Sequence, residues 1–221
     1  MSQTLGSYSG SRGRFITFEG GEGAGKSTQI RLLSERLKGQ KLDICMTREP
    51  GGSPGAEAIR KLIVEGEPGR WDAITETLLF AAARRDHVER TIRPALNRGA
   101  YVLCDRFADS TIAYQGYGGE VDIDLIRRLS DTATNGLSPD LTLIFDLPVE
   151  EGLKRAAGRA GGEDRFERKG IDFHQRMRDG FLTIANAEPR RCAVIDATAA
   201  PDDVARRVDA VVRDRLGLGA L

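Results

Sequence analysis

The residues best suited to chemistry form a glycine-rich run near the start of the chain, Gly20-Gly21-Glu22-Gly23-Ala24-Gly25-Lys26-Ser27. Their spacing is that of a phosphate-binding loop, G-x-x-x-x-G-K-[ST], in which glycines let consecutive backbone N–H groups turn inward around an anion. Lys26 is expected to reach the terminal phosphates of a nucleotide, and the Ser27 hydroxyl to ligate Mg²⁺. A chance glycine-rich turn is the alternative. The apolar run before the loop and the helical pattern after it favour the functional interpretation.

Charged residues also follow two other apolar runs. Asp105 and Arg106 come directly after the run 101–104, and Arg48 opens the irregular segment Arg48-Glu49-Pro50-Gly51-Gly52. In an open parallel sheet, the loops at the carboxyl ends of the strands line the ligand crevice. Asp105 therefore takes the place of a carboxylate that holds Mg²⁺, directly or through water, and Arg48 could hold a second anion. A surface ion pair is the alternative for Asp105 and Arg106.

Further stretches carry candidate side chains. Phe80 and Arg84 lie four residues apart in a helical pattern and so share a face, although spacing alone also allows a core phenylalanine and a solvated arginine. His87 is expected at the surface, since no histidine or cysteine stands at metal-ligand spacing from it. Residues 107–116 mix hydroxyls, an aromatic ring and an amide, which suits a nucleoside-binding wall. Glycine and arginine in residues 158–165 predict a mobile basic flap, with an inert solvated loop as the alternative.

Alternating strand-like and helical patterns must position these residues. Apolar runs predict strands over 14–19, 42–47, 101–105, 141–146 and 191–196, and helical periodicity predicts helices over 26–38, 53–64, 72–96, 122–132, 149–157, 172–187 and 202–215. Five strands alternating with helices predict an α/β fold with a doubly wound parallel sheet flanked by helices. We expect one domain over residues 14–221, after a flexible tail at residues 1–13 that is rich in serine and glycine.

The composition limits the classes of function. The chain has 33 basic and 33 acidic residues, so no overall field favours nucleic acid or an anionic membrane as a partner. No apolar run approaches the length of a transmembrane helix. Cys45, Cys104 and Cys192 are widely spaced within apolar runs, which indicates reduced core thiols and a cytoplasmic protein.

Phosphoryl transfer to a bound acceptor is the reaction that the pattern favours. The guanine-recognising Asn-Lys-x-Asp of a GTPase is absent, and the strand before Arg106 ends in one carboxylate rather than the pair typical of a motor ATPase. No Ser-His-Asp set is evident, and a phosphate acceptor is already anionic and needs no base. The reaction instead needs cations that offset the repulsion of two polyanions and stabilise the transferring group. The candidates are Lys26, Arg48, Arg106, Arg155, Arg159 and Arg165.

The chain resembles the bacterial thymidylate kinases from about residue 14 to its end. The resemblance rests on Phe18-Glu19-Gly20 with the phosphate loop, Thr47-Arg48-Glu49-Pro50-Gly51-Gly52, Leu79-Phe80 with Arg84, Asp105-Arg106-Phe107 with Ser110-Thr111 and Tyr114-Gln115-Gly116, and Pro139-Asp140-Leu141-Thr142. It implies a P-loop kinase fold with a mobile lid at about residues 155–167. It also implies transfer of the ATP γ-phosphoryl group to dTMP with Mg²⁺, giving dTDP and ADP for dTTP synthesis, usually in a homodimer.

The resemblance further implies which residues bind each partner. The residues that would bind ATP are Gly20, Gly21, Glu22, Gly23, Ala24, Gly25, Lys26, Ser27, Thr28, Arg155 and Arg159. Those that would bind dTMP are Glu19, Arg48, Phe80, Arg84, Arg106, Ser110, Thr111, Tyr114 and Gln115. Mg²⁺ would be held by Ser27 and Asp105, and the residues that would act in catalysis are Lys26, Arg106, Arg159, Asp105 and Glu22. Arg48 would hold the dTMP phosphate. Phe80 would stack on thymine, Arg84 would bond the base carbonyl edge, and Tyr114 would sit under the deoxyribose.

Members of this family differ in the source of one arginine. Some carry it inside the phosphate loop, and others supply arginines from the lid. Here Glu22 stands in the loop position while Arg155, Arg159 and Arg165 surround the flap, so the chain resembles the second kind, with Arg159 the best candidate for the γ-phosphate. Two other functions stay open: a kinase of the same fold that acts on another nucleotide or nucleoside, and a non-catalytic nucleotide-binding sensor.

Overall fold

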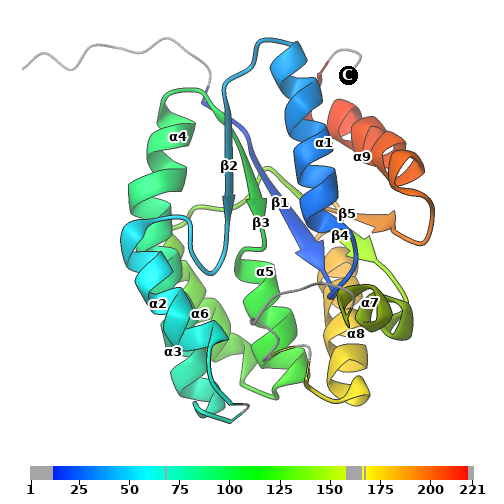
Figure 1. Ribbon diagram of the computed structural model, residues 1–221. Helices are drawn as coiled ribbons and strands as arrows, with labels where there is room; N and C mark the ends of the chain where they lie inside the picture. The colour runs from blue at the N-terminus through cyan, green and yellow to red at the C-terminus, as the bar shows by residue number, and fades with distance from the viewer. Residues whose placement is uncertain (1–11, 68, 158–165, 167, 219–221) are drawn as a thin grey trace, which may run out of the picture.

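A single parallel sheet forms the centre of the molecule (Figure 1). The computed structural model describes residues 12–67, 69–157, 166 and 168–218. Within these residues the sheet has five strands in the order β2-β3-β1-β4-β5, and every neighbouring pair is parallel. The strands are β1 (Phe15–Gly20), β2 (Ile44–Arg48), β3 (Tyr101–Asp105), β4 (Leu141–Asp146) and β5 (Cys192–Asp196). The predicted α/β parallel sheet is confirmed.

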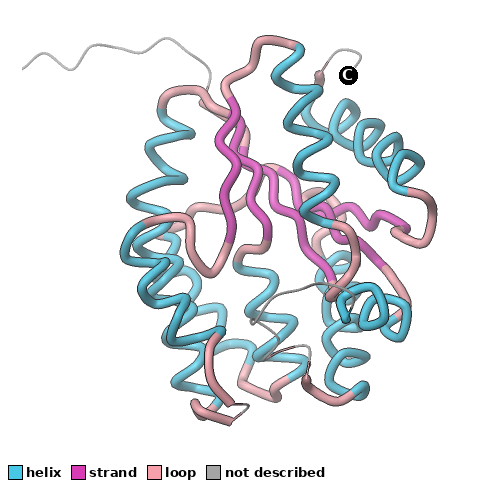
Figure 2. Tube along the Cα trace, in the orientation of Figure 1, coloured by secondary structure: helices cyan, strands magenta, loops and turns pink. Residues whose placement is uncertain are grey.

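Helices connect the strands and cover both faces of the sheet (Figure 2). They are α1 (Lys26–Gly39), α2 (Pro54–Val64), α3 (Ala73–His87), η1 (Val88–Ile92), α4 (Arg93–Asn97), α5 (Ala108–Thr111), η2 (Ile112–Gly118), α6 (Ile123–Thr134), α7 (Val149–Ala157), α8 (Ile171–Ala187) and α9 (Pro201–Leu216). Helices α1 and α9 contact each other on one face, while α4, α5 and α8 contact strands from the other. Among the described residues, no helix has both the length and the apolar content needed to cross a membrane.

Burial on both faces explains the apolar strand sequences. In β1, Phe15 belongs to the apolar cluster under α4, whereas Ile16 and Phe18 belong to the cluster under α1 and α9. Successive side chains of a strand point to opposite faces, so a doubly covered strand must be apolar at nearly every position. Periodicity alone therefore located all five strands to within two residues at each end.

Two segments are π-helical, η1 and η2. The long helix predicted over 72–96 is interrupted by η1 between α3 and α4, close to Pro94, whose missing N–H cannot close a normal turn. The wall segment 107–116, for which we made no prediction of secondary structure, folds as α5 followed by η2. The predicted tail 1–13 lies almost wholly outside the described residues, and of the predicted lid 155–167 only residues 155–157 and 166 lie within them.

Register brings the functional strand ends together. Asp105 at the end of β3 pairs with Phe18 of β1 on one side and with Arg48 of β2 on the other. The phosphate loop continues from β1 into α1, whose first residue follows Gly25 at φ 84° without a side-chain cap. The first N–H groups of α1 therefore stay available to an anion at this edge.

Candidate active site

A cleft with a volume of about 920 Å³ opens at the carboxyl edge of the sheet. Most of the site residues predicted from the sequence line this cleft. They are Glu22, Gly23, Ala24, Gly25, Lys26, Ser27, Thr28, Arg48, Phe80, Arg84, Asp105, Arg106, Ser110, Thr111, Tyr114 and Gln115. The volume lies near the upper end of the range for ligand pockets, about 300–1,000 Å³. These residues extend from the phosphate loop after β1 to η2, so the cleft gathers side chains that are far apart in the chain.

The phosphate loop holds its own lysine in place. Lys26 Nζ donates to the carbonyl oxygens of Gly20 and Gly21, at 3.1 and 2.8 Å. Burial and the nearby charge of Arg106 lower the pKa of Lys26 to about 8, although neighbouring carboxylates oppose that shift. Gly23 fixes the loop against α7, because a Cβ on Gly23 would lie 2.1 Å from the carbonyl oxygen of Gly152.

Oxygen donors suited to Mg²⁺ meet at the start of α1. Ser27 Oγ donates to Asp105 Oδ2 at 2.8 Å, which joins the phosphate loop to the end of β3. Mg²⁺ prefers hard oxygen ligands and is often held by one or two carboxylates together with substrate phosphates and water. The hydroxyl and the carboxylate fit that donor set.

Arg106 and Glu22 join the two ends of the cleft. Arg106 Nη2 donates to Glu22 Oε1 at 3.0 Å, and the Tyr114 hydroxyl donates to the same oxygen at 2.6 Å. Burial alone would raise the pKa of Glu22, but attraction to Arg106 and Lys26 and the bond from Tyr114 lower it to about 2. The Arg106 guanidinium also lies 4.9 Å from the centre of the Tyr114 ring. Glu22 is thus an anion that fixes a cation between the phosphate loop and η2.

The end of the cleft remote from the phosphate loop is polar and aromatic. Arg84 Nη2 donates to Thr111 Oγ1 at 2.9 Å, and Gln115 Nε2 donates to Glu76 Oε1 at 2.9 Å. Gln115 is buried, and its Oε1 has no hydrogen-bond partner among the described residues. Phe80 contributes an aromatic face here, 6.2 Å from the ring of Phe166. A flat ligand with a hydrogen-bond donor on its edge would fit this end.

Two predictions about the helix that carries Phe80 are settled by burial. Arg84 is buried, not a solvated charge, and donates from Nε to Glu49 Oε2 at 2.8 Å. The prediction that His87 lies at the surface is wrong, since its side chain is fully buried against Glu49. Helical spacing could not reveal either fact, because Glu49, the partner that Arg84 and His87 share, lies in the loop after β2.

Arg48 and Arg60 line the cleft beside that loop. Arg48 is exposed and its Nη2 lies 3.3 Å from Glu57 Oε2, while Arg60 donates to the Pro50 carbonyl at 2.6 Å. We did not predict Arg60. Its position one helical turn after Glu57 is the only signal that could have suggested it, because helical spacing puts both on one face of α2.

Some of the site residues predicted from the sequence lie outside the cleft wall. Glu19 is fully buried behind it and accepts from Phe107 N at 2.7 Å and Ser110 Oγ at 2.5 Å. Gly20 and Gly21 contribute only their carbonyls to Lys26 and Arg106. Arg155 pairs with Glu151 and donates to the Ala197 carbonyl at 3.3 Å. Arg159 and Arg165 lie outside the described residues.

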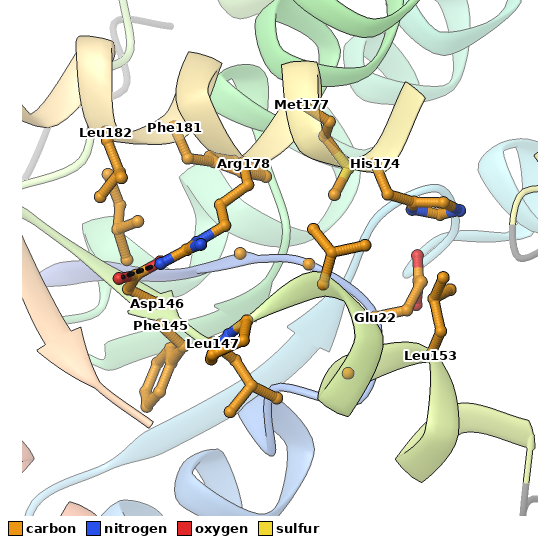
Figure 3. Close-up of a pocket in the computed structure, with 16 residues that line it drawn as sticks. Glu22, Phe145, Asp146, Leu147, Leu153, His174, Met177, Arg178, Phe181 and Leu182 are labelled. Atoms are coloured by element: carbon orange, nitrogen blue, oxygen red, sulfur yellow. Dashed lines mark hydrogen bonds and ion pairs between the residues drawn. The ribbon is translucent and has the colours of Figure 1, made fainter. Parts of the chain in front are cut away.

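A much smaller cavity lies behind the phosphate loop, between β4, α7 and α8 (Figure 3). Its volume is about 20 Å³, enough for roughly one water molecule. Asp146 and Arg178 close one side with a two-point ion pair of 2.6 and 3.0 Å. No nucleotide fits there, so the cleft in front of the loop is the candidate active site.

The parallel sheet, the phosphate loop and the two-ended cleft define a P-loop kinase fold. The family model for thymidylate kinase matches residues 18–208. A thymidylate kinase from Caulobacter vibrioides is 61% identical over 207 residues, covering 94% of this chain and 99% of that protein, and one from Rhodopseudomonas palustris (strain TIE-1) is 59% identical over 210 residues, covering 93% and 90%. The crystal structure of a thymidylate kinase from Ehrlichia chaffeensis superposes with a TM-score of 0.74 at 37% identity, covering 91% of this chain and 99% of that one. The chain therefore belongs to the thymidylate kinase family.

Glu19 makes stability depend on pH. Burial and the nearby Asp109 raise its pKa to about 7 from an ordinary value of 4.5. The folded protein therefore favours the protonated carboxyl of Glu19. Its contribution to the free energy of unfolding is complete below pH 4.5 and is lost as the pH rises through 7. We expect the free energy of unfolding of the wild type to fall by about 2 kcal/mol more than that of Glu19→Gln between pH 5.5 and pH 8.5, since the amide stays neutral. Urea unfolding measures this difference.

The exposed Glu150 supplies a matched control. Glu150→Gln replaces a glutamate that is already exposed to solvent. The free energy of unfolding of this variant should therefore change with pH as that of the wild type does. Parallel curves for the wild type and Glu19→Gln would mean that Glu19 is ionised throughout this range.

Proposed function

We propose that this protein transfers the γ-phosphoryl group of ATP to dTMP, giving dTDP and ADP. Family membership supports the reaction. The observation that carries the choice of acceptor is the buried Gln115 Oε1, which has no hydrogen-bond partner in the part of the chain that the structure describes. Its amide cannot turn over, because Nε2 donates to the Glu76 carboxylate, which only accepts. Oε1 therefore needs a donor from the ligand, and the N3–H of thymine supplies one.

Arg84 complements that hydrogen bond. Its guanidinium lines the cleft beside Thr111 and suits the carbonyl oxygen next to N3 of thymine. Cytosine presents an acceptor at N3 and an amino group beside it, so both partners would meet a group of the wrong kind. Phe80 offers its ring to the face of the base. We call this end, with Arg48, the acceptor half of the cleft, and the phosphate loop the donor half.

The donor half would bind the phosphates of ATP. Lys26 and the N–H groups at the start of α1 would contact the terminal phosphates, and Ser27 and Asp105 would hold Mg²⁺. When bound, Mg²⁺ neutralises part of the developing charge on the phosphoryl oxygens. Arg106, anchored by Glu22, would lie between the donor and acceptor phosphates, and Arg48 would leave Glu57 to hold the dTMP phosphate. The role of Arg159 at the γ-phosphate stays a prediction.

Cellular setting and domain organisation are also proposed. Cys45, Cys104 and Cys192 are free thiols, which supports a reducing compartment such as the cytoplasm. One continuous sheet supports a single nucleoside monophosphate kinase domain over residues 14–221. A homodimer is supported by exposed apolar side chains on the neighbouring helices α2 and α3, namely Leu62, Ile74 and Leu78.

A panel of acceptors tests the function. With ATP and Mg²⁺, ADP release should be fastest with dTMP, and kcat/KM for dCMP should be about 100-fold lower, because a site built around a buried hydrogen bond rejects the mismatched edge. dUMP, dGMP, AMP and thymidine complete the panel. Preference for any of these over dTMP would indicate another kinase of this fold. Binding of ATP and dTMP without dTDP formation would indicate a sensor.

Gln115→Met tests the base contact. The substitution keeps the length of the side chain but removes the acceptor for N3–H, so KM for dTMP should rise about tenfold or more. The variant should also discriminate less than the wild type against dTMP methylated at N3, which lacks the donor. Gln175→Met, on the exposed face of α8, is the matched control. Equal increases in KM for both ligands would place the contact elsewhere.

Sedimentation equilibrium tests the homodimer. The wild type should have twice the chain mass of 24.1 kDa, and Leu78→Glu should shift the mass toward that of one chain, since a charge would replace a 49% exposed leucine on α3. Val194→Glu is the control, because Val194 is 46% exposed on β5, at the other edge of the sheet. A monomeric wild type, or dissociation by Val194→Glu alone, would contradict this surface.

A further inference from the structure

His87 is a buried side chain that the proposed substrate contacts do not use. It is the last residue of α3, three residues after Arg84, and its side chain is fully buried. Both ring nitrogens have side-chain partners: Nδ1 lies 3.1 Å from Glu49 Oε1, and Nε2 lies 2.6 Å from Thr47 Oγ1. A ring held at two points cannot rotate without breaking a buried hydrogen bond.

The partners assign the proton of the ring. An ionised carboxylate only accepts, so the neutral imidazole carries its hydrogen on Nδ1 and donates it to Glu49. Nε2 then accepts from the Thr47 hydroxyl, which can donate. This tautomer satisfies all three groups, so the imidazole directs one oxygen of Glu49.

Glu49 transmits that constraint to Arg84. The other oxygen of Glu49, Oε2, accepts from Arg84 Nε at 2.8 Å, in an ion pair whose side chains are only 2% and 4% exposed. Arg84 Nη2 donates to the Phe107 carbonyl and to Thr111 Oγ1. Nη1 makes no hydrogen bond within the described part of the chain and is the edge of the guanidinium left for a ligand. Its direction follows from the bond at Nε.

The same ring contacts the end of β2, where Arg48 lies, and the loop that follows. Thr47 directly precedes Arg48, and a Cβ on Gly52 would lie 2.4 Å from His87 Nε2. Gly52 has a φ of +83°, so its backbone comes this close to the ring in a conformation that suits glycine. His87 therefore packs between the residue proposed for the base and the segment proposed for the phosphate.

We propose that His87 is a positioning residue for the acceptor nucleotide: through Glu49 it directs Arg84 at the base, and through Thr47 and Gly52 it supports the end of β2, where Arg48 lies. This inference rests on the proposed function, in which Arg84 bonds the carbonyl edge of thymine. His87 is fully buried, touches no substrate and moves no proton in the reaction.

Two substitutions separate the two hydrogen bonds. His87→Leu removes both, so KM for dTMP should rise about tenfold or more, while kcat stays within threefold and KM for ATP within twofold. The ratio of kcat/KM for dTMP to that for dCMP should fall about tenfold, because a misdirected Arg84 no longer distinguishes a carbonyl from an amino group. His87→Asn keeps a donor at the position of Nδ1 and should recover most of this ratio.

Two further variants test the route of the effect. In an Arg84→Met background, His87→Leu should change the dTMP-to-dCMP ratio of kcat/KM by less than twofold, since the residue that distinguishes the two bases is gone. Thr91→Val is the matched control. It removes the 2.7 Å bond from Thr91 Oγ1 to the Gly52 carbonyl, which anchors the same loop without touching Glu49, and should leave the dTMP-to-dCMP ratio within twofold of the wild type.

Several results would overturn the proposal. The first is an equal rise in KM for ATP and for dTMP in His87→Leu. The second is an unchanged dTMP-to-dCMP ratio in a folded His87→Leu protein. The third is full additivity of the effects of His87→Leu and Arg84→Met on that ratio. If His87→Leu does not fold, His87→Gln keeps a polar group near the position of Nε2 but loses the donor at Nδ1, and a dTMP-to-dCMP ratio that fails to drop about threefold decides against the proposal. Failure of the wild type to phosphorylate dTMP would reject the proposed function itself, before any variant is compared.

Discussion

Parallel pairing of β2, β3 and β1 is the constraint on which the rest of the site depends. The register sets Asp105 beside Arg48 on one side and beside the strand that enters the phosphate loop on the other. A shift of β3 by one residue would turn Asp105 to the opposite face of the sheet and break its bond to Ser27. The two apolar layers hold that register, because β1 and β3 are buried on both faces. Core packing, far from the cleft, thus decides where the charges meet.

The cleft is electrostatically paired before any substrate enters. Arg106 is matched by Glu22, Arg84 by Glu49, and Arg48 by Glu57. A buried cation without a partner would cost folding free energy. The paired carboxylates therefore allow many cations to line the cleft of a folded protein that has no net charge. The pairs differ in exposure, since Arg84 and Glu49 are buried whereas Arg48 and Glu57 are largely exposed. The buried pair maintains a fixed geometry, and the exposed pair is the one that the proposed acceptor phosphate would exchange at little cost.

What the sequence predicted depends on how local each signal is. Strands, most helices and the phosphate loop were located because apolar runs, helical spacing and glycine placement act within a few residues. Spacing also placed Phe80 and Arg84 on one face of a helix. It did not show which way that face points, since this depends on packing against the loop after β2. The burial of His87 and the placement of Glu19 behind Ser110 arise from contacts 38 and 91 residues apart in the chain. No local pattern reports such partners, and the π-helical turn that presents Gln115 has no known local signature either.

The hydrogen bonds of Lys26 to Gly20 and Gly21 bear on the exchange of nucleotides. The ammonium group already has oxygen acceptors, and the loop around it is already folded against Gly152. In the proposed binding mode, a donor nucleotide would replace one set of oxygens with another and would not have to order the phosphate loop. Little conformational entropy of this loop would be lost when the nucleotide binds, and little would be regained when it leaves. Successive donors would then bind to a phosphate loop that is already folded.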